Sequence, residues 1–204
     1  MTELPSDRQA NGPESLGDLL AAMTPDEGQE RVSVENVLGK VGGRSFPAVI
    51  LVPCVVLVSP LSGIPLTPTL GGLVVLLITL QVLIGRKHLW LPDFLSRRSV
   101  PAHRMQKAID WLSKPAAFMD RHSHNRLRIL TSGPARYFAY LTTSVLALSW
   151  PPLELLPFVT SFSAGAVAMI MYGLMVRDGA YTLAGYVQAV VLYLALLSLW
   201  IGVF

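Results

Sequence analysis

The feature that most limits the possible folds is a set of long apolar stretches that carry almost no charge. Two of them, residues 46–84 and 137–176, are interrupted by prolines, and a third, 181–203, contains none. Lipid cannot hydrogen-bond to the backbone, so such stretches cross or enter a membrane as helices, and carbonyls freed by proline must face protein or water. The sequence therefore predicts an all-α integral membrane protein with about five apolar membrane segments.

The overall composition agrees with this class. Of 204 residues, 52% are hydrophobic and only 14% are charged, whereas soluble domains carry about 25% charged residues. This composition excludes intrinsic disorder and a freely soluble domain. Cys54 is the single cysteine, so no intramolecular disulfide can form, and an apolar packing role is expected for it. The acidic N-terminus does not have the pattern of a cleaved signal peptide.

Charge divides the chain into segments of different character. Residues 1–45 hold four basic and eight acidic residues, while residues 86–136 hold eleven basic and three acidic ones. The basic segment is expected in the cytoplasm by the positive-inside rule. We divide the chain into a disordered lead (1–14), cytoplasmic amphipathic helices (15–45), a first membrane half (46–85), a basic cytoplasmic segment (86–136), a second membrane half (137–179) and a C-terminal transmembrane helix (180–204).

Several charged residues have expected roles in this layout. Arg86, Arg177 and Asp178 end apolar runs and are interpreted as membrane-boundary charges. A second group lies in the basic segment and is expected to contact anionic lipid headgroups or a partner protein, namely Arg97, Arg98, Arg104 and Lys107. No nucleic-acid partner is expected, because no recognition motif accompanies the charge.

Short amphipathic helices are expected outside the apolar stretches. Ser15 can cap a helix with apolar residues at positions 16, 19, 20 and 23, and Ser33 can cap a second over 34–41. Residues 101–112 form a third amphipathic pattern, with Met105 and Ile109 on its apolar face. This last helix is interpreted either as lying on an anionic membrane surface or as a solvated helix that caps the membrane bundle.

The two proline-broken stretches have a similar layout. A shift of 92 positions superimposes the prolines that break them, Pro60 on Pro152 and Pro65 on Pro157. Paired broken helices in two halves of a chain point to a transporter-type site, and chance similarity of two apolar stretches is the alternative. If both broken pairs return to the side they entered, the halves form a parallel repeat and the C-terminus lies outside.

Polar residues within the apolar stretches are the candidates for a functional site. Glu154 lies between Pro152 and Pro157, and Gln81 lies within the run that ends at residue 84. Ionisable groups at membrane depth are functional candidates, so we predict an intramembrane polar site formed by Glu154, Gln81, Ser62 and Thr67. The alternatives are a Glu154 solvated in an outer turn and a Gln81 that joins neighbouring helices. Small residues spaced four apart in 161–168 predict close helix packing, or a homodimer face.

Nothing in the sequence points to catalysis. The four histidines all lie in the basic segment, and their spacing is not that of a helical metal site. No phosphate-binding glycine loop and no nucleophile elbow occur. We therefore expect no metal, no cofactor and no enzymatic activity.

Several short segments are distinctive in their order and spacing: Ser-Leu-Gly-Asp-Leu-Leu at 15–20, 31–38, Gln-Val-Leu-Ile-Gly-Arg at 81–86, Trp-Leu-Pro at 90–92, and the segments 101–111, 152–157 and 178–179. In these segments the chain resembles the bacterial ExoD exopolysaccharide-synthesis proteins. The chain departs from the family's expected pattern at Glu154, where a small polar residue is as common as an acid. The resemblance implies a multi-pass protein of the bacterial inner membrane that serves exopolysaccharide production, with polysaccharide-synthesis proteins as candidate partners.

Three functions remain at this stage. The first is a small transporter, channel or lipid-translocating protein with a polar site between two related halves. The second is a non-catalytic membrane scaffold that uses its basic segment to hold partners or anionic lipid. A membrane enzyme ranks below both, because the sequence offers no paired acidic or histidine residues for it.

Overall fold

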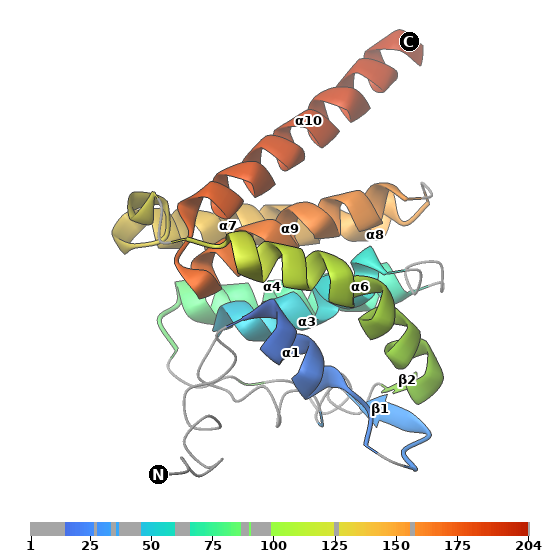
Figure 1. Ribbon diagram of the computed structural model, residues 1–204. Helices are drawn as coiled ribbons and strands as arrows, with labels where there is room; N and C mark the ends of the chain where they lie inside the picture. Colours follow the sequence, from blue (N-terminus) through green and yellow to red (C-terminus); the bar gives the residue numbers. More distant parts are fainter. Residues whose placement is uncertain are drawn as a thin grey trace.

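The computed structural model describes residues 15–26, 28–33, 36, 46–59, 66–86, 90, 99–124, 127–155 and 158–203. In these ranges the protein is almost entirely helical, with eight α-helices, which confirms the predicted all-α class. Two apolar hairpins form the centre, a layer of charged and amphipathic elements covers one side, and the last helix leaves the bundle at an angle (Figure 1).

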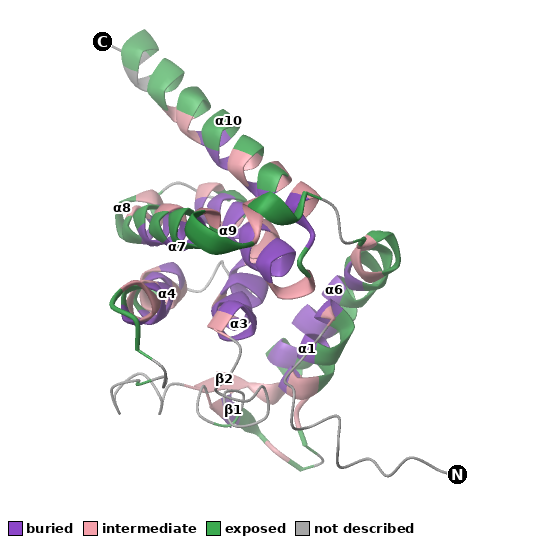
Figure 2. Cartoon of the chain, turned by 90° about the vertical axis from the view of Figure 1, so that its left-hand side faces the viewer, coloured by how far each residue is buried: buried purple, intermediate pink, exposed green. Residues whose placement is uncertain are grey.

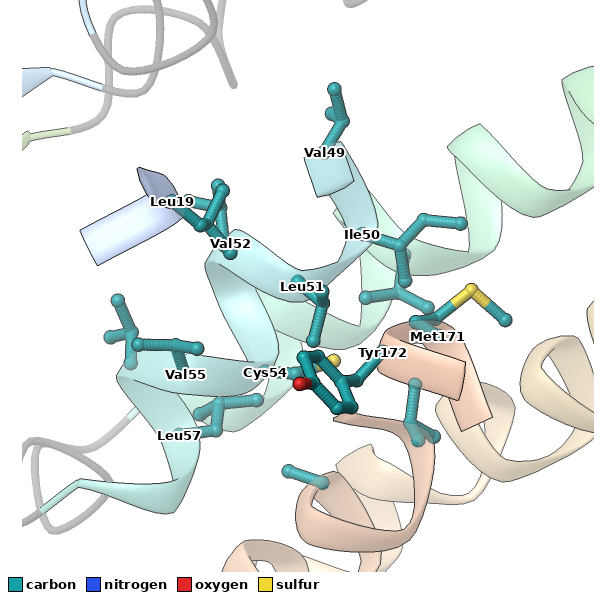
Figure 3. Close-up of a cluster of buried hydrophobic side chains, with 14 of the residues drawn as sticks. Leu19, Val49, Ile50, Leu51, Val52, Cys54, Val55, Leu57, Met171 and Tyr172 are labelled. Atoms are coloured by element: carbon teal, nitrogen blue, oxygen red, sulfur yellow. The ribbon is translucent and has the colours of Figure 1, made fainter. Parts of the chain in front are cut away.

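The first hairpin consists of α3 (Phe46–Val58) and α4 (Thr67–Leu83). Helix α3 is the central helix of the protein, because most of its side chains are buried and it packs on both α4 and α9. It continues through Pro53. Figure 3 shows Leu51 and Cys54 of α3 beside Tyr172 of α9. The buried Cys54 thus has the apolar packing role expected from the sequence.

The second hairpin consists of α7 (Gly133–Leu148), the one-turn helix α8 (Trp150–Leu153) and α9 (Val159–Val176). Trp150 is fully buried, and its indole Nε1 donates to Ser163 Oγ at 3.0 Å. Helix α7 packs against α4, and the contact is close because a Cβ on Gly72 would lie 2.9 Å from the carbonyl oxygen of Ala147. Both helices of each hairpin therefore pack against the other hairpin, α3 on α9 and α4 on α7.

The second helices of the two hairpins begin and end at equivalent positions. Leu66 precedes α4 with φ 69° and Phe158 precedes α9 with φ 64°, and these two residues are 92 positions apart. Gly85 and Arg177, which follow the same helices with φ 81° and 57°, are also 92 apart. A left-handed conformation is uncommon for a residue other than glycine. The closing hydrogen bonds match too, from Arg86 N–H to the Gln81 carbonyl and from Asp178 N–H to the Gly173 carbonyl, each 2.9 Å.

A charged layer lies beside α3. It contains α1 (Leu16–Met23), a two-stranded antiparallel sheet of β1 (Arg31–Ser33) and β2 (Ser99–Pro101), and α6 (Ala102–His122). Figure 2 shows α1 and α6 on one side of α3, with α4 and α7 on the other. The apolar face of α1 packs on α6, so each amphipathic helix buries its stripe against the protein itself.

The amphipathic elements agree only partly with the sequence prediction. Ser15 caps α1 as predicted, since its Oγ accepts the Asp18 N–H at 3.0 Å. The helix expected over 101–112 continues to residue 122 through Pro115. The sequence did not predict the strands. The helix expected over 34–41 lies outside the described residues apart from Asn36, whose N–H donates to Ser33 Oγ at 3.1 Å.

The last element is α10 (Gly179–Val203), which contacts the short 3-10 helix η3 (Arg128–Leu130). The outer half of α10 leaves the bundle (Figures 1 and 2). Its first half packs tightly on α9, because a Cβ on Gly185 would lie 2.6 Å from the Ala166 carbonyl oxygen. Small residues of α9 and α10 therefore serve a contact within the chain.

Only α9 and α10, among the helices of the described ranges, are long and apolar enough to cross a membrane. Helices α3 and α4 are apolar but shorter, and α4 with 17 residues extends about 25 Å, less than the roughly 30 Å of a bilayer core. Within the described residues the structure thus gives two candidate spans, and the expectation of about five membrane segments stays a prediction.

Candidate functional site

The ends of the two hairpins meet at Glu154. This residue follows α8, and its Oε1 accepts the Leu66 N–H at 2.5 Å while its Oε2 accepts the Thr69 hydroxyl at 2.5 Å. The first turn of a helix has unpaired N–H groups and a partial positive charge, so a carboxylate there is stabilised. Glu154 of the second half thus caps α4 of the first half. We call this contact the hairpin-tip contact.

The hairpin-tip contact favours an ionised carboxylate. Partial burial raises the pKa of Glu154, but the hydrogen bonds from the Thr69 hydroxyl and from the backbone of Leu66 and Thr69 together outweigh it, so the pKa is lowered. Glu154 lies outside both candidate spans and is partly exposed. At neutral pH it is therefore an anion held by donors of the other hairpin.

Several residues of the predicted polar site lie near this contact or outside the described chain. Thr67 is half-buried at the first position of α4. The hydroxyl that reaches Glu154 belongs to Thr69, which the sequence prediction missed. Pro152 is exposed within α8. Four predicted residues fall outside the described ranges, namely Ser62, Pro60, Pro65 and Pro157.

Gln81 lies far from Glu154, so the structure does not bring these two predicted site residues together. Gln81 and Thr69 are separated by twelve positions on α4, which corresponds to about 18 Å along the helix. The Gln81 amide instead binds the backbone of Trp90 on both sides, with Oε1 accepting the N–H at 2.7 Å and Nε2 donating to the carbonyl at 2.8 Å. Gln81 therefore fixes the backbone of Trp90 to the last turns of α4.

The charges at the opposite end of the hairpins, which we call the base, have distinct roles. Arg86 and Arg177 are exposed just after α4 and α9. Asp178 is buried, and its Oδ1 accepts the Ala180 N–H at 3.0 Å while its Oδ2 accepts the His124 N–H at 2.8 Å. Asp178 therefore caps α10 and ties it to the end of the basic segment.

A second carboxylate at the base, Asp120, was not recognised from the sequence. Its Oδ1 accepts the Leu16 N–H at 2.9 Å and the Tyr172 hydroxyl at 2.8 Å, and its Oδ2 accepts the Gly17 N–H at 2.8 Å. The Tyr181 hydroxyl donates to the Met119 carbonyl at 3.1 Å. The end of α6 is thus joined to α1, α9 and α10. No local sequence signal marks Asp120, because its partners lie 52 to 104 positions away.

Hydroxyl groups pair between the two hairpins away from these charges. Ser144 of α7 donates to Thr79 Oγ1 of α4 at 2.7 Å, and Thr79 in turn donates to the Val75 carbonyl at 2.9 Å. Such pairs stabilise helix contacts in a membrane by modest amounts. They join the two hairpins through α4 and α7.

The remaining predicted contacts concern the basic segment. Arg104 and Lys107 are exposed on α6, whereas Arg97 and Arg98 lie outside the described residues. Within the described part of the chain, no three histidine, cysteine or acidic residues gather as metal ligands would.

Comparison with known proteins gives two findings. Residues 16–198 match the family described as "Exopolysaccharide synthesis, ExoD". The chain is also 27% identical over 194 residues to Protein ExoD of Rhizobium meliloti (strain 1021). The aligned region covers 90% of this chain and 78% of that protein. No solved structure matches significantly.

Proposed function

The chain belongs to the ExoD family of exopolysaccharide synthesis, and on this premise we propose that it is a small transport protein of the bacterial inner membrane. The two candidate spans and the family match support membrane association. In the proposal, two related hairpins form a pathway for an ion, a small solute or a lipid, and Glu154 joins them at the tip. The single observation that carries the proposal is the hairpin-tip contact between halves.

An internal repeat is the first part of the proposal. Uncommon left-handed residues begin α4 and α9 at Leu66 and Phe158, and the same spacing of 92 relates Gly85 to Arg177. The packing of α3 on α9 is matched by that of α7 on α4, as a two-fold relation between halves requires. Paired broken helices in two halves are typical of transporters.

A common entry side is the second part. Glu154 joins the tips, so both hairpins turn at the same end. The opposite end carries Arg86, Arg136 and Arg177. By the positive-inside rule the base faces the cytoplasm. We propose that both hairpins enter from the cytoplasm as a parallel repeat, and that α10 crosses to place the C-terminus outside.

The proposal is tested by flux in vesicles that contain the purified full chain. The probes are protons, detected with an internal pH dye, potassium ions, and a phosphatidylglycerol with a fluorescent acyl chain. We expect at least one probe to cross faster than in empty vesicles, and Glu154→Gln to reduce that rate while the inserted amount stays equal. Asp110→Asn is the matched control, because Asp110 is an exposed acid on α6. If no probe crosses, or if Glu154→Gln crosses at the wild-type rate, the transport proposal is wrong.

The scaffold function is the second candidate, and the exposed cations of α6 favour it. It expects that exopolysaccharide production in cells depends on Arg104 and Lys107 and not on Glu154. Production by cells carrying Glu154→Gln, compared with Arg104→Gln together with Lys107→Gln, separates the two functions when the membrane contains equal protein. Loss with the first variant alone supports transport, and loss with the second alone supports the scaffold.

A further inference from the structure

One face of α6 carries basic and aromatic side chains in a regular row. Its members are spaced alternately three and four residues apart and all are exposed: Arg104, Lys107, Trp111, Lys114, Phe118 and Arg121. Residues three and four apart lie on one face of a helix. We call this row the α6 outer stripe. It contains four cations with an aromatic ring on either side of Lys114.

Packing within the protein does not account for the stripe. Helix α6 buries a different face, formed by Met105, Ala108, Ile109, Leu112 and Ala116, against the rest of the protein. Trp111 and Phe118 remain 54% and 58% exposed, although large aromatic side chains are usually buried where a core is available. The Phe118 ring contacts its own helix, where its centroid lies 4.2 Å from that of His122, and the side chains of Trp111 and Phe118 both offer exposed apolar surface on a charged face.

The acidic residues of α6 do not neutralise the stripe. Asp120 points to α1 and α9, where its oxygens accept two backbone N–H groups and the Tyr172 hydroxyl. Asp110 lies beside the stripe, and its Oδ1 accepts the Gln106 amide at 2.9 Å. The four cations therefore present a net positive row.

The stripe is attached directly to the candidate membrane spans. The C-terminal end of α6 is held to α9 through Asp120 and Tyr172 and to α10 through Met119 and Tyr181. The rings of Tyr172 and Tyr181 also contact each other edge to face, with centroids 5.0 Å apart. The C-terminal end of α6, with Phe118 and Arg121 of the stripe, therefore lies at the base of the two apolar spans, and the rest of the helix extends away from it (Figure 1).

We infer that the α6 outer stripe binds the anionic phospholipid headgroups of the leaflet at the hairpin base. Lysine and arginine near a membrane are attracted to anionic lipids, and tryptophan and phenylalanine insert at the boundary of headgroups and chains. The stripe offers both types of side chain in one row. This inference does not depend on transport, since a scaffold could bind lipid in the same way.

The test uses the full chain in vesicles, with a fluorescent label on one introduced cysteine and a nitroxide on the lipid headgroups. The first label replaces Pro115, which is exposed between Trp111 and Phe118, so all six stripe residues remain. The second replaces Ser113, exposed two residues earlier and therefore about 200° away around the helix. Cys54→Ala removes the buried native cysteine. Vesicles contain phosphatidylcholine with or without phosphatidylglycerol.

We expect headgroup quenching of the label at position 115 to at least double when phosphatidylglycerol is added. The label at 113 should change little. Lys107→Gln combined with Lys114→Gln should reduce quenching at 115 to the level seen at 113, and high salt should do the same because it screens exposed charges. Equal quenching at 113 and 115, or quenching at 115 that does not respond to phosphatidylglycerol, overturns the inference. The stripe would then face water and suit an acidic protein segment.

Discussion

Replacing Asp120 with alanine is expected to release α1 from the rest of the protein. The carboxylate satisfies the first two N–H groups of α1, those of Leu16 and Gly17, from a different helix. It also accepts the Tyr172 hydroxyl of α9. One substitution thus removes three hydrogen bonds that join α1, α6 and α9.

The size of the effect follows from the groups left without a partner. Loss of a side chain that caps a helix N-terminus costs about 1 kcal/mol, and a buried donor that loses its partner costs about 1–3 kcal/mol. The free energy needed to detach α1 should therefore fall by about 2–4 kcal/mol. Since 1.4 kcal/mol corresponds to a factor of ten, amide exchange in α1 should rise about 30-fold or more.

Hydrogen–deuterium exchange of the purified protein in detergent measures this change by segment. In Asp120→Ala, amides of α1 should exchange faster, while those of α4 and α7 should stay as in the wild type. Asp110→Asn removes an exposed acid from the same helix and serves as the control. If α1 exchanges equally slowly in Asp120→Ala, the apolar face of α1 alone holds it in place and the reasoning is refuted.

Three further expectations concern other contacts. Gly185→Ala would place a Cβ 2.6 Å from a carbonyl oxygen of α9, so it should lower the stability of the α9–α10 contact by about 1–3 kcal/mol. Thermal unfolding measures this loss. The control is Gly202→Ala, whose Cβ meets nothing within 4 Å and which should leave the unfolding temperature unchanged. Because the folded pKa of Glu154 is lowered, its stabilising effect is complete above the ordinary glutamate pKa and is lost as pH falls through the lowered value. The difference in unfolding midpoint between wild type and Glu154→Gln should therefore shrink as the pH falls below the ordinary glutamate pKa of about 4.3, and a constant difference would contradict this. Gln81→Leu leaves the Trp90 backbone without its partners and should speed proteolysis just after α4, with no change in α9.

The helices could be predicted from the sequence because their signals are local. The apolar residues of α1 and α6 repeat with helical periodicity, and Ser15 marks the start of α1. The hairpin helices are marked instead by continuous apolar runs without charge. The sequence prediction ended this amphipathic helix at residue 112, whereas α6 continues through Pro115 to residue 122. The two strands have three residues each, too few to produce an alternating pattern.

The candidate site could be predicted only in part because its contacts join distant parts of the chain. The sequence indicated that Glu154 is unusual and that Gln81 needs a partner. It could not indicate that the hydroxyl of Thr69, 85 positions before Glu154, donates to the Glu154 carboxylate. Nor could it indicate that the backbone N–H of Trp90 donates to the Gln81 side chain. Glu154 and Gln81 were both predicted as residues of one polar site, yet their contacts lie at opposite ends of α4.

The residues that begin α4 and α9 combine a left-handed backbone with an exposed apolar side chain. Leu66 and Phe158 adopt a left-handed backbone that costs about 1–3 kcal/mol in a residue with a side chain, and glycine would remove this strain. Their side chains are also 64% and 83% exposed. In water, glycine would improve both the backbone and the surface at each position. If the tips reach the bilayer as proposed, each of these side chains gains a nonpolar environment that glycine could not use.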